Sequence, residues 1–132
     1  MHDVPRLDPI AFTRELCEIE STTYSEGRVG DFLAQFLADR GWAVEKTAVP
    51  QPAESASGGD RWNVYAGRKG ETPDVVFSTH MDTVPPYIPF REDDEFIHGR
   101  GVCDAKGIIA AQVAAAEQLR SAGFRIGLLF VS

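Results

Sequence analysis

The sequence predicts an α/β protein, layered α/β/α, in which helices cover a central mixed sheet. Two observations carry this prediction. Segments with apolar residues at helical spacing alternate with segments that have the composition of strands. The expected strands are also long and apolar, with little alternation of polar and apolar positions, as in strands buried inside a layered fold. The 132 residues suffice for one hydrophobic core.

Two amphipathic helices are expected in the first third of the chain. Asp8-Pro9 suits a helix start, and Phe12, Leu16 and Ile19 then share one face. The second helix has the fuller amphipathic pattern and should end before Gly41. Its apolar face consists of Val29, Phe32, Leu33, Phe36 and Leu37.

The strands expected along the rest of the chain differ in length and in their neighbours. They cover residues 42–49, 62–66, 75–81, 96–98 and 125–131. The segment 50–60, rich in proline, serine and glycine, should form a mobile loop within the domain. The last strand is expected to lack a neighbour in the sheet and a covering helix. Since an unpaired apolar strand is prone to aggregation, this expectation suggests a truncated chain.

A first motif lies where the strand 75–81 ends. His80 and Asp82 are two positions apart, so on a strand both side chains point to the same side. A neutral imidazole can give one nitrogen to a metal while a carboxylate holds its other N–H group. Asp82 is placed to be that partner of His80. A hydrogen bond between the two at a strand end, without any metal, is the alternative interpretation.

A second motif surrounds Asp104. Gly99, Gly101 and Gly107 flank it, and a helix is expected immediately afterwards. Apolar residues at helical spacing define that helix, and Gly123 suits its end: Ile109, Val113, Ala116 and Leu119. Asp104 at a helix start could be an ordinary N-cap. A carboxylate can also bridge two cations about 3.5–4 Å apart, and the two roles are compatible.

The two motifs, HMDTVP at 80–85 and GRGVCDAKG at 99–107, resemble those of the M20 family of di-zinc peptidases and deacylases. That family includes acetylornithine deacetylase, succinyl-diaminopimelate desuccinylase and glutamate carboxypeptidase. The segments 16–22 and 37–42 are similar to the family's N-terminal part, so the resemblance covers essentially the whole chain. It implies a zinc-peptidase-like fold in which residues 1–132 form the N-terminal portion of a catalytic domain. The family's lid domain, which also forms the dimer interface of a homodimer, would be absent.

The resemblance also implies roles for the motif residues. His80 would ligate one metal, Asp104 would bridge two, and Asp82 would orient His80. A cis peptide bond is expected between Asp104 and Ala105. The implied cofactors are two divalent metal ions, most readily zinc, although the same ligands also suit cobalt or manganese.

The function implied by the resemblance is hydrolysis of amide bonds by a metal-activated water. The substrate would be a small peptide or an N-acyl amino acid. The family's next motif, a Glu-Glu pair that supplies the general base and a further ligand, is absent from this chain. Because catalytic zinc usually takes three protein ligands and a water, the 132-residue chain alone is expected to be inactive. The alternative is a non-catalytic short relative that serves as a binding or interaction module.

A thiol hydrolase is a third hypothesis, with Cys103 as nucleophile and His80 as base. The carboxylate of the adjoining Asp104 opposes it, because a neighbouring negative charge disfavours a thiolate. The chain has two cysteines, Cys17 and Cys103, far apart and without a Cys-x-x-Cys motif. Buried thiols in a reducing compartment are therefore expected.

Charge and hydropathy exclude several partners and locations. A net charge of −7 argues against nucleic acid and against an anionic membrane as partner. The N-terminal residues lack the apolar stretch of a secretory signal, and no run is long enough to span a bilayer. A cytoplasmic location is therefore expected, with a small-molecule substrate as the partner.

Overall fold

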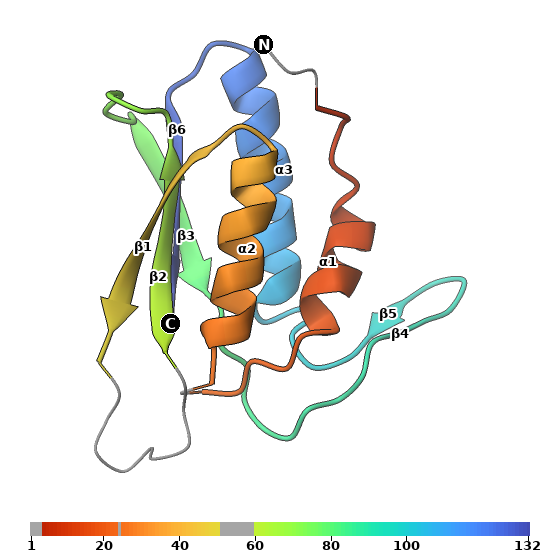
Figure 1. Cartoon of the computed structure of the whole chain (residues 1–132). Helices are drawn as coiled ribbons and strands as arrows, with labels where there is room; N and C mark the ends of the chain where they lie inside the picture. Colours follow the sequence, from red (N-terminus) through yellow and green to blue (C-terminus); the bar gives the residue numbers. More distant parts are fainter. Residues whose placement is uncertain (1–3, 24, 51–59) are drawn as a thin grey trace.

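The computed structural model describes residues 4–23, 25–50 and 60–132, and in these ranges it contains three helices and six strands (Figure 1). They are α1 (Pro9–Cys17), α2 (Gly27–Asp39), β1 (Ala43–Val49), β2 (Arg61–Gly67), β3 (Val75–His80), β4 (Arg91–Glu92), β5 (Ile97–His98), α3 (Lys106–Ser121) and β6 (Ile126–Val131). Every helix and strand expected from the sequence is present, and only the short β4 was not expected. Most of the predicted loop at 50–60 lies outside the described residues.

Four strands form a mixed sheet in the order β1-β2-β6-β3, which confirms the predicted mixed α/β class. The β1–β2 and β2–β6 pairs are antiparallel, whereas β3 and β6 are parallel. The expectation that the last strand lacks a neighbour is wrong, because β6 pairs with strands on both sides. The chain leaves β3, crosses over through α3 and returns as β6 into the place between β3 and β2, which buries the apolar strand instead of exposing it.

All three helices lie on the same face of the sheet (Figure 1). Helix α2 packs on β1 and β2, α3 packs on β3 and β6, and α1 packs against α3. Their buried side chains form one core with the sheet, which includes Phe12, Leu16, Leu33, Leu37, Val64, Ile109, Val113, Leu128 and Phe130. In the part of the chain that the structure describes, the opposite face of the sheet has no helix, so the expected third layer is not seen there.

A buried polar contact ties the end of α2 to α3. The Arg40 guanidinium donates to both carboxylate oxygens of Glu117, with a shortest distance of 2.6 Å from Nη2 to Oε1. The indole Nε1 of Trp42 donates to the same carboxylate at 3.1 Å. Since Arg40 and Glu117 are only 13% and 16% exposed, this group is part of the packing between the two helices.

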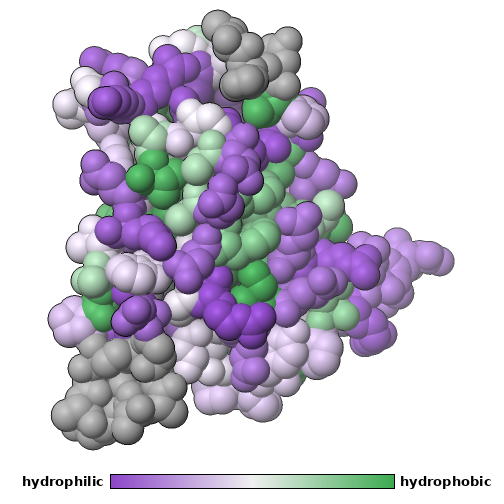
Figure 2. All heavy atoms as spheres, in the orientation of Figure 1, coloured by the Kyte–Doolittle hydropathy of each residue, from purple (hydrophilic) through white to green (hydrophobic). Residues whose placement is uncertain are grey.

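The hairpin of β4 and β5 projects away from the helices (Figure 1), and hydrophilic residues cover the same protrusion in Figure 2. The Asp93 carboxylate accepts hydrogen bonds from the backbone N–H groups of Glu95 and Phe96 at 2.9 and 2.8 Å, which holds the turn. His98 Nε2 lies 3.0 Å from the other oxygen of Asp93. The acidic residues Asp93, Asp94 and Glu95 thus lie on a solvent-exposed turn. Among the described residues, no helix combines the length and hydropathy needed to cross a membrane.

Candidate metal centre

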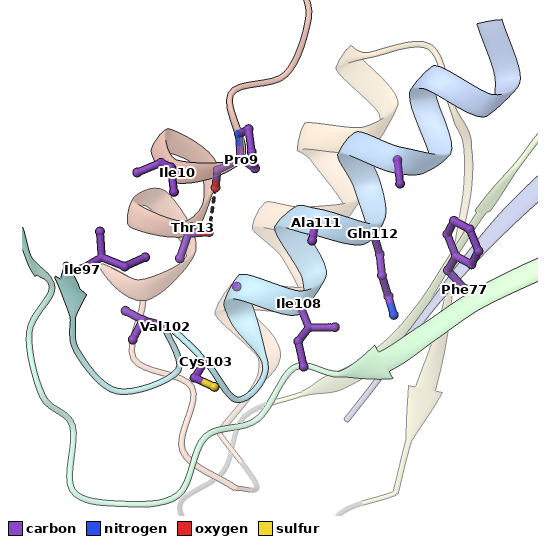
Figure 3. A pocket seen from close by; sticks show the side chains of 12 residues that line it. Pro9, Ile10, Thr13, Phe77, Ile97, Val102, Cys103, Ile108, Ala111 and Gln112 are labelled. Atoms are coloured by element: carbon purple, nitrogen blue, oxygen red, sulfur yellow. Dashed lines mark hydrogen bonds between the residues drawn. The ribbon is translucent and has the colours of Figure 1, made fainter. Parts of the chain in front are cut away.

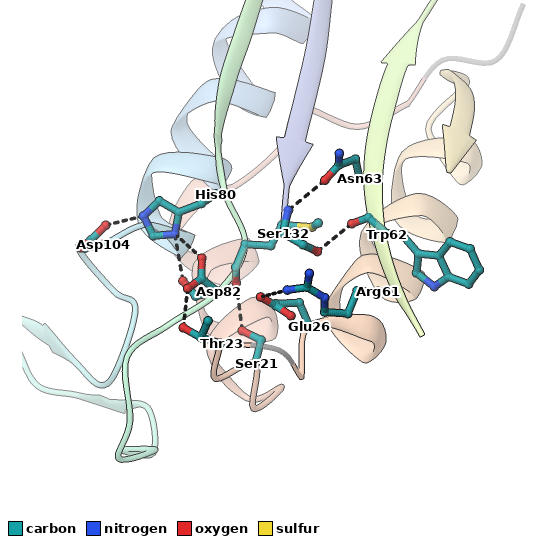
Figure 4. Close-up of polar contacts among 11 residues, drawn as sticks. Ser21, Thr23, Glu26, Arg61, Trp62, Asn63, His80, Asp82, Asp104 and Ser132 are labelled. Carbon is teal, nitrogen blue, oxygen red and sulfur yellow. Dashed lines mark hydrogen bonds and ion pairs between the residues drawn. The ribbon is translucent and has the colours of Figure 1, made fainter. Parts of the chain in front are cut away.

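Three side chains singled out in the sequence meet where β3 ends (Figure 4). His80 is the last residue of β3, and Asp104 lies on the loop before α3. His80 Nε2 is 2.8 Å from Asp104 Oδ1. On the other side of the ring, Nδ1 is 2.9 Å from the main-chain oxygen of Asp82 and 3.1 Å from its Oδ1. The imidazole therefore lies between two carboxylates, one at each nitrogen.

Asp104 does not cap the helix that follows it. The N-cap of α3 is Ala105, and no side chain accepts a capping hydrogen bond there. The interpretation of Asp104 as an ordinary N-cap is therefore wrong. Its side chain is 80% exposed and faces His80 instead. The peptide bond between Asp104 and Ala105 is cis, as the family resemblance implied.

Two glycines of the second motif allow the loop to lie this close to its neighbours. Gly101 has a positive φ of +95°, and a Cβ there would stand 2.9 Å from Cγ2 of Thr83. At Gly107 a Cβ would collide with the carbonyl of Val102. Glycine is thus required at Gly101 by backbone conformation and at Gly107 by space. Gly101 lets the second motif lie against Thr83 of the first, and Gly107 lets the second motif fold back on Val102.

Two effects of opposite sign act on the pKa of His80. Partial burial of the ring by itself lowers the pKa, but the hydrogen bond with Asp104 and the contacts with Asp82 outweigh burial and leave the pKa raised. Nearby negative charge favours the cationic form of an imidazole. The cluster consequently attracts positive charge, whether that charge is a proton or a metal cation.

The nitrogen of His80 and the oxygen of Asp104 are of the kinds that bind a divalent cation, and the distance between them is close to the distance between two ligand atoms of one zinc ion. Imidazole nitrogen and carboxylate oxygen are both zinc ligands, and a tetrahedral zinc with bonds of about 2.0–2.2 Å holds its ligand atoms ~3.3 Å apart. His80 Nε2 and Asp104 Oδ1 stand 2.8 Å apart, and the exposed Asp104 side chain has room to move. No group of three or more His, Cys, Asp or Glu side chains that could hold a metal occurs among the described residues. In the described part of the chain, the candidate ligand atoms are therefore His80 Nε2 and Asp104 Oδ1.

A groove of about 650 Å³ lies between α1, α3 and β3 and is the other candidate for a site (Figure 3). It is lined mainly by apolar side chains: Pro9, Ile10, Phe77, Ile97, Val102, Ile108, Ala111 and Ala115. The only titratable side chain in its lining is the thiol of Cys103, and none of the three clustered residues lines it. Apart from the Cys103 thiol, the groove lacks groups that bind a metal or transfer a proton, so the His80 cluster is the candidate for chemistry.

In the part of the chain that the structure describes, the hydrogen bonds of the His80 imidazole involve neither thiol. The hydrogen bonds of the His80 ring go to Asp82 and Asp104, and none joins it to Cys103 in the described residues. The expectation of buried thiols is confirmed for Cys17, where burial raises the pKa of the thiol to about 11, and is wrong for Cys103, which is exposed. Cys17 therefore lacks the lowered pKa of an activated thiolate, and Cys103 lacks a hydrogen bond to the His80 base among the described residues.

Two residues outside the candidate set, Thr23 and Lys106, also make polar contacts at or near the cluster. Thr23 Oγ1 donates to Asp82 Oδ2 at 2.7 Å. Lys106 is 1% exposed, and its ammonium donates to the main-chain oxygen of Ile19 at 2.5 Å. Burial lowers the pKa of Lys106 to about 8. No local pattern signals these contacts, because the residues of each pair lie far apart in the sequence.

Comparison with known sequences identifies relatives of the chain. The sequence model of "Peptidase family M20/M25/M40" matches residues 76–132, which include both motifs. A protein of Paracoccidioides brasiliensis named "Probable carboxypeptidase" is 41% identical over 134 residues, which amount to 92% of this chain and 30% of that protein. The chain thus spans about 30% of the length of the curated relatives that it matches.

Solved structures with the same fold include two peptidases. Human carnosine dipeptidase 1 superposes with a TM-score of 0.72 at 20% identity, over 93% of this chain and 31% of that chain. An M20 family metallo-carboxypeptidase from Sulfolobus solfataricus gives a TM-score of 0.68 at 15% identity, over 94% of this chain and 30% of that chain. At these identities the likeness establishes the fold alone. Taken with the matched motifs and the more similar sequences, it leads to one conclusion: the chain belongs to peptidase family M20/M25/M40.

Proposed function

We propose that the protein of which this chain is part hydrolyses amide bonds in small peptides or N-acyl amino acids with the help of divalent metal ions. Residues 1–132 would form the N-terminal portion of its catalytic domain, and the lid and dimerisation domain would lie outside them. The observation that carries this proposal is the meeting of His80 Nε2 and Asp104 Oδ1 at 2.8 Å, in a family of peptidases.

Each residue of the cluster has a distinct role in this proposal. His80 would give Nε2 to one cation, while the main-chain oxygen and the carboxylate of Asp82 hold the other ring nitrogen, Nδ1. Asp104 would help to hold the cations with its exposed carboxylate. When bound, two zinc, cobalt or manganese ions polarise a substrate carbonyl and lower the pKa of a bound water to about 7.

The exposure of the cluster suits a small substrate. The side chains of His80 and Asp104 are 40% and 80% exposed, so both are open to solvent in the described part of the chain. The relatives named above as a carboxypeptidase and a dipeptidase act on peptides, as their names state. A short peptide or an acylated amino acid therefore fits both the family and the open position of the cluster.

A non-catalytic binding module remains the second candidate function. It is favoured by one observation, that no third metal ligand joins His80 and Asp104 among the described residues. The same observation leads us to propose that the 132-residue chain alone binds metal without turnover.

The proposal is tested by assaying the protein, as its gene encodes it, against dipeptides and N-acetyl amino acids. Activity should disappear after treatment with a chelator and return with zinc, cobalt or manganese. His80→Ala should abolish it, and Cys103→Ala should leave it unchanged. Hydrolysis that survives chelation, or that depends on Cys103 and not on His80, would contradict the proposal, and a protein that binds metal but hydrolyses none of these substrates would favour the binding module.

A further inference from the structure

Glu26, the residue before α2, has a fully buried carboxylate that makes no hydrogen bond among the described residues. Its main-chain oxygen accepts from Gly30 N at 2.9 Å, as at an ordinary helix start, but its side chain does not cap the helix. Arg61 Nη1 lies 3.6 Å from Glu26 Oε1, which is close enough for an ion pair and too far for a good hydrogen bond. The carboxylate therefore has a positive charge beside it but no hydrogen-bond donor in the described part of the chain.

A carboxylate in this situation is costly to bury. An ionised carboxylate has about four acceptor sites, which water fills in the unfolded chain. Attraction to a buried cation offsets the loss of that water only when further hydrogen bonds satisfy the remaining lone pairs. The Arg61 side chain is 8% exposed, so both members of the pair are shielded from solvent. A donor to Glu26 is therefore expected, either from a buried water or from a neighbouring segment.

The register of the sheet indicates which segment can supply that donor. β2 and β6 are antiparallel, and their register, continued to the ends of the strands, puts Trp62 opposite Ser132. Ser132 Oγ donates to the main-chain oxygen of Trp62 at 3.0 Å, in agreement with this pairing. The residue after Ser132 would in the same register lie opposite Arg61, which pairs with Glu26. Figure 4 shows Glu26 and Arg61 beside Ser132 at this end of the sheet.

The same end of the sheet carries the candidate metal centre. β6 lies between β2 and β3, and in the parallel pair with β3 its Val131 is beside His80. A segment that continues β6 past Ser132 therefore leaves the sheet with the Glu26 carboxylate on one side and His80 on the other (Figure 4). The relatives named above are longer than this chain, which spans about 30% of their length.

We propose that Glu26 is a positioning residue: in the complete protein its carboxylate accepts the backbone N–H groups of the residues directly after Ser132 and fixes that segment beside the metal centre. The proposal rests on the proposed function, since it takes the chain as part of a longer protein. Backbone N–H groups that leave a strand where its ladder ends need acceptors of their own. Their hydrogen bonds to a carboxylate are charge-assisted and stronger than bonds between neutral groups.

The test uses the complete protein, as its gene encodes it, with the variants Glu26→Met and Glu26→Gln. Methionine keeps the approximate shape of the side chain without an acceptor oxygen, and glutamine keeps one acceptor oxygen without the charge. Glu45→Gln, at an exposed glutamate of β1, is the matched control for Glu26→Gln. Hydrogen exchange followed by mass spectrometry reports on the backbone N–H groups after Ser132, and kcat and KM are measured with a dipeptide.

In Glu26→Met, the N–H groups directly after Ser132 should exchange at least about tenfold faster, because they lose a hydrogen bond to a charged acceptor. Exchange in β2 and α2 should stay near the parent rates. Since the displaced segment adjoins His80, kcat should fall by up to about 100-fold while KM changes little. Glu26→Gln should show the same effects to a smaller degree, and Glu45→Gln should keep the parent values.

Three results would overturn the proposal. One is unchanged exchange after Ser132 in Glu26→Met, which would leave a buried water as the donor to the carboxylate. Another is exchange that rises equally after Ser132 and in β2 and α2, since Glu26 would then stabilise the fold only. The third is a gene that ends at Ser132. A complete protein that hydrolyses no peptide would contradict the proposed function, and the exchange measurement would still decide the role of Glu26.

Discussion

His80 and Asp104 lie 24 positions apart in the sequence, and Nε2 of the one stands 2.8 Å from Oδ1 of the other. They meet because β3 and the loop before α3 end at the same edge of the sheet (Figure 4). Both side chains remain open to solvent, whereas the residues that hold the loop, such as Gly101 and Lys106, are buried. The residues that fix the position of the loop are therefore different from the residues whose side chains could bind a cation.

This division predicts that the two cluster residues contribute little to stability. An exposed charged pair contributes at most about 1 kcal/mol, so His80→Ala and Asp104→Asn should each change the free energy of unfolding by less than about 1 kcal/mol. The core substitution Leu33→Ala should cost about 2–5 kcal/mol in the same urea titrations. A loss of several kcal/mol at either cluster residue would mean that the pair is structural.

The contact between Arg40 and Glu117, by contrast, should contribute strongly to the free energy of unfolding. Glu117→Ala leaves the partly buried Arg40 guanidinium without its carboxylate, and we expect a loss of about 1.5–3 kcal/mol in unfolding free energy. Asp74→Ala is the matched control. It breaks the Asp74–Arg125 pair, which has a distance of 2.7 Å but is 62% and 55% exposed, and it should cost less than about 1 kcal/mol. Equal losses in the two urea titrations would contradict this assignment.

The buried Lys106 should make stability depend on pH. Its pKa is about 8 in the folded chain, lowered by burial from 10.5. Between these pH values the unfolded chain holds one more proton, so the free energy of unfolding should rise with pH, by an amount on the order of 3 kcal/mol. Lys106→Met should remove this rise, and Lys69→Met, at an exposed lysine, should keep it.

The measurement is urea unfolding from pH 7 to pH 10.5, performed in a Cys17→Ala background. Cys17 must be removed because burial raises the pKa of its thiol from 9.0 to about 11. In the pH range between those values the folded chain keeps a proton that the unfolded chain has lost, so Cys17 contributes a fall in stability that would mask part of the rise. A flat or falling profile with Lys106 present would show that its ammonium is not buried.

The two thiols should differ in reactivity toward iodoacetamide. Cys103 is exposed, whereas Cys17 is buried and the pKa of its thiol is raised to about 11. Because the thiolate is the reactive form, Cys103 should be alkylated in the native chain and Cys17 only after unfolding in urea. Mass spectrometry of native and unfolded samples identifies the modified residue. Alkylation of Cys17 at the same rate as Cys103 under native conditions would contradict its burial.

Much of the fold could be predicted because its signals are local. Asp8 caps α1 through its side chain, and Gly41 follows α2 with a φ of +90°, so the sequence predicts where each helix begins or ends. The place of β6 could not be predicted in this way. The apolar pattern of Ile126–Val131 shows that the strand is buried, but it does not show that β2 and β3 are the two neighbours, since strand order depends on contacts between distant segments.

The candidate site follows the same rule. His80, Asp82 and Asp104 could be identified because they belong to two short motifs. Thr23 and Lys106 could not, because each acts through one contact across 59 or 87 positions. A hydrogen bond between residues that lie far apart in the sequence produces no recognisable pattern of residue types, so only the folded structure shows the partner of the hydroxyl or the ammonium.

The most direct test of the proposed metal centre is a zinc titration of the 132-residue chain, followed through the imidazole NMR signals of His80 and His98. The two histidines are internal controls for each other, because each pairs with an aspartate, at 2.8 Å for His80–Asp104 and 3.0 Å for His98–Asp93. We expect a saturable change at His80 that Asp104→Asn weakens, and no comparable change at His98. Equal responses of both histidines, or no saturable response of His80, would contradict a metal centre at the end of β3.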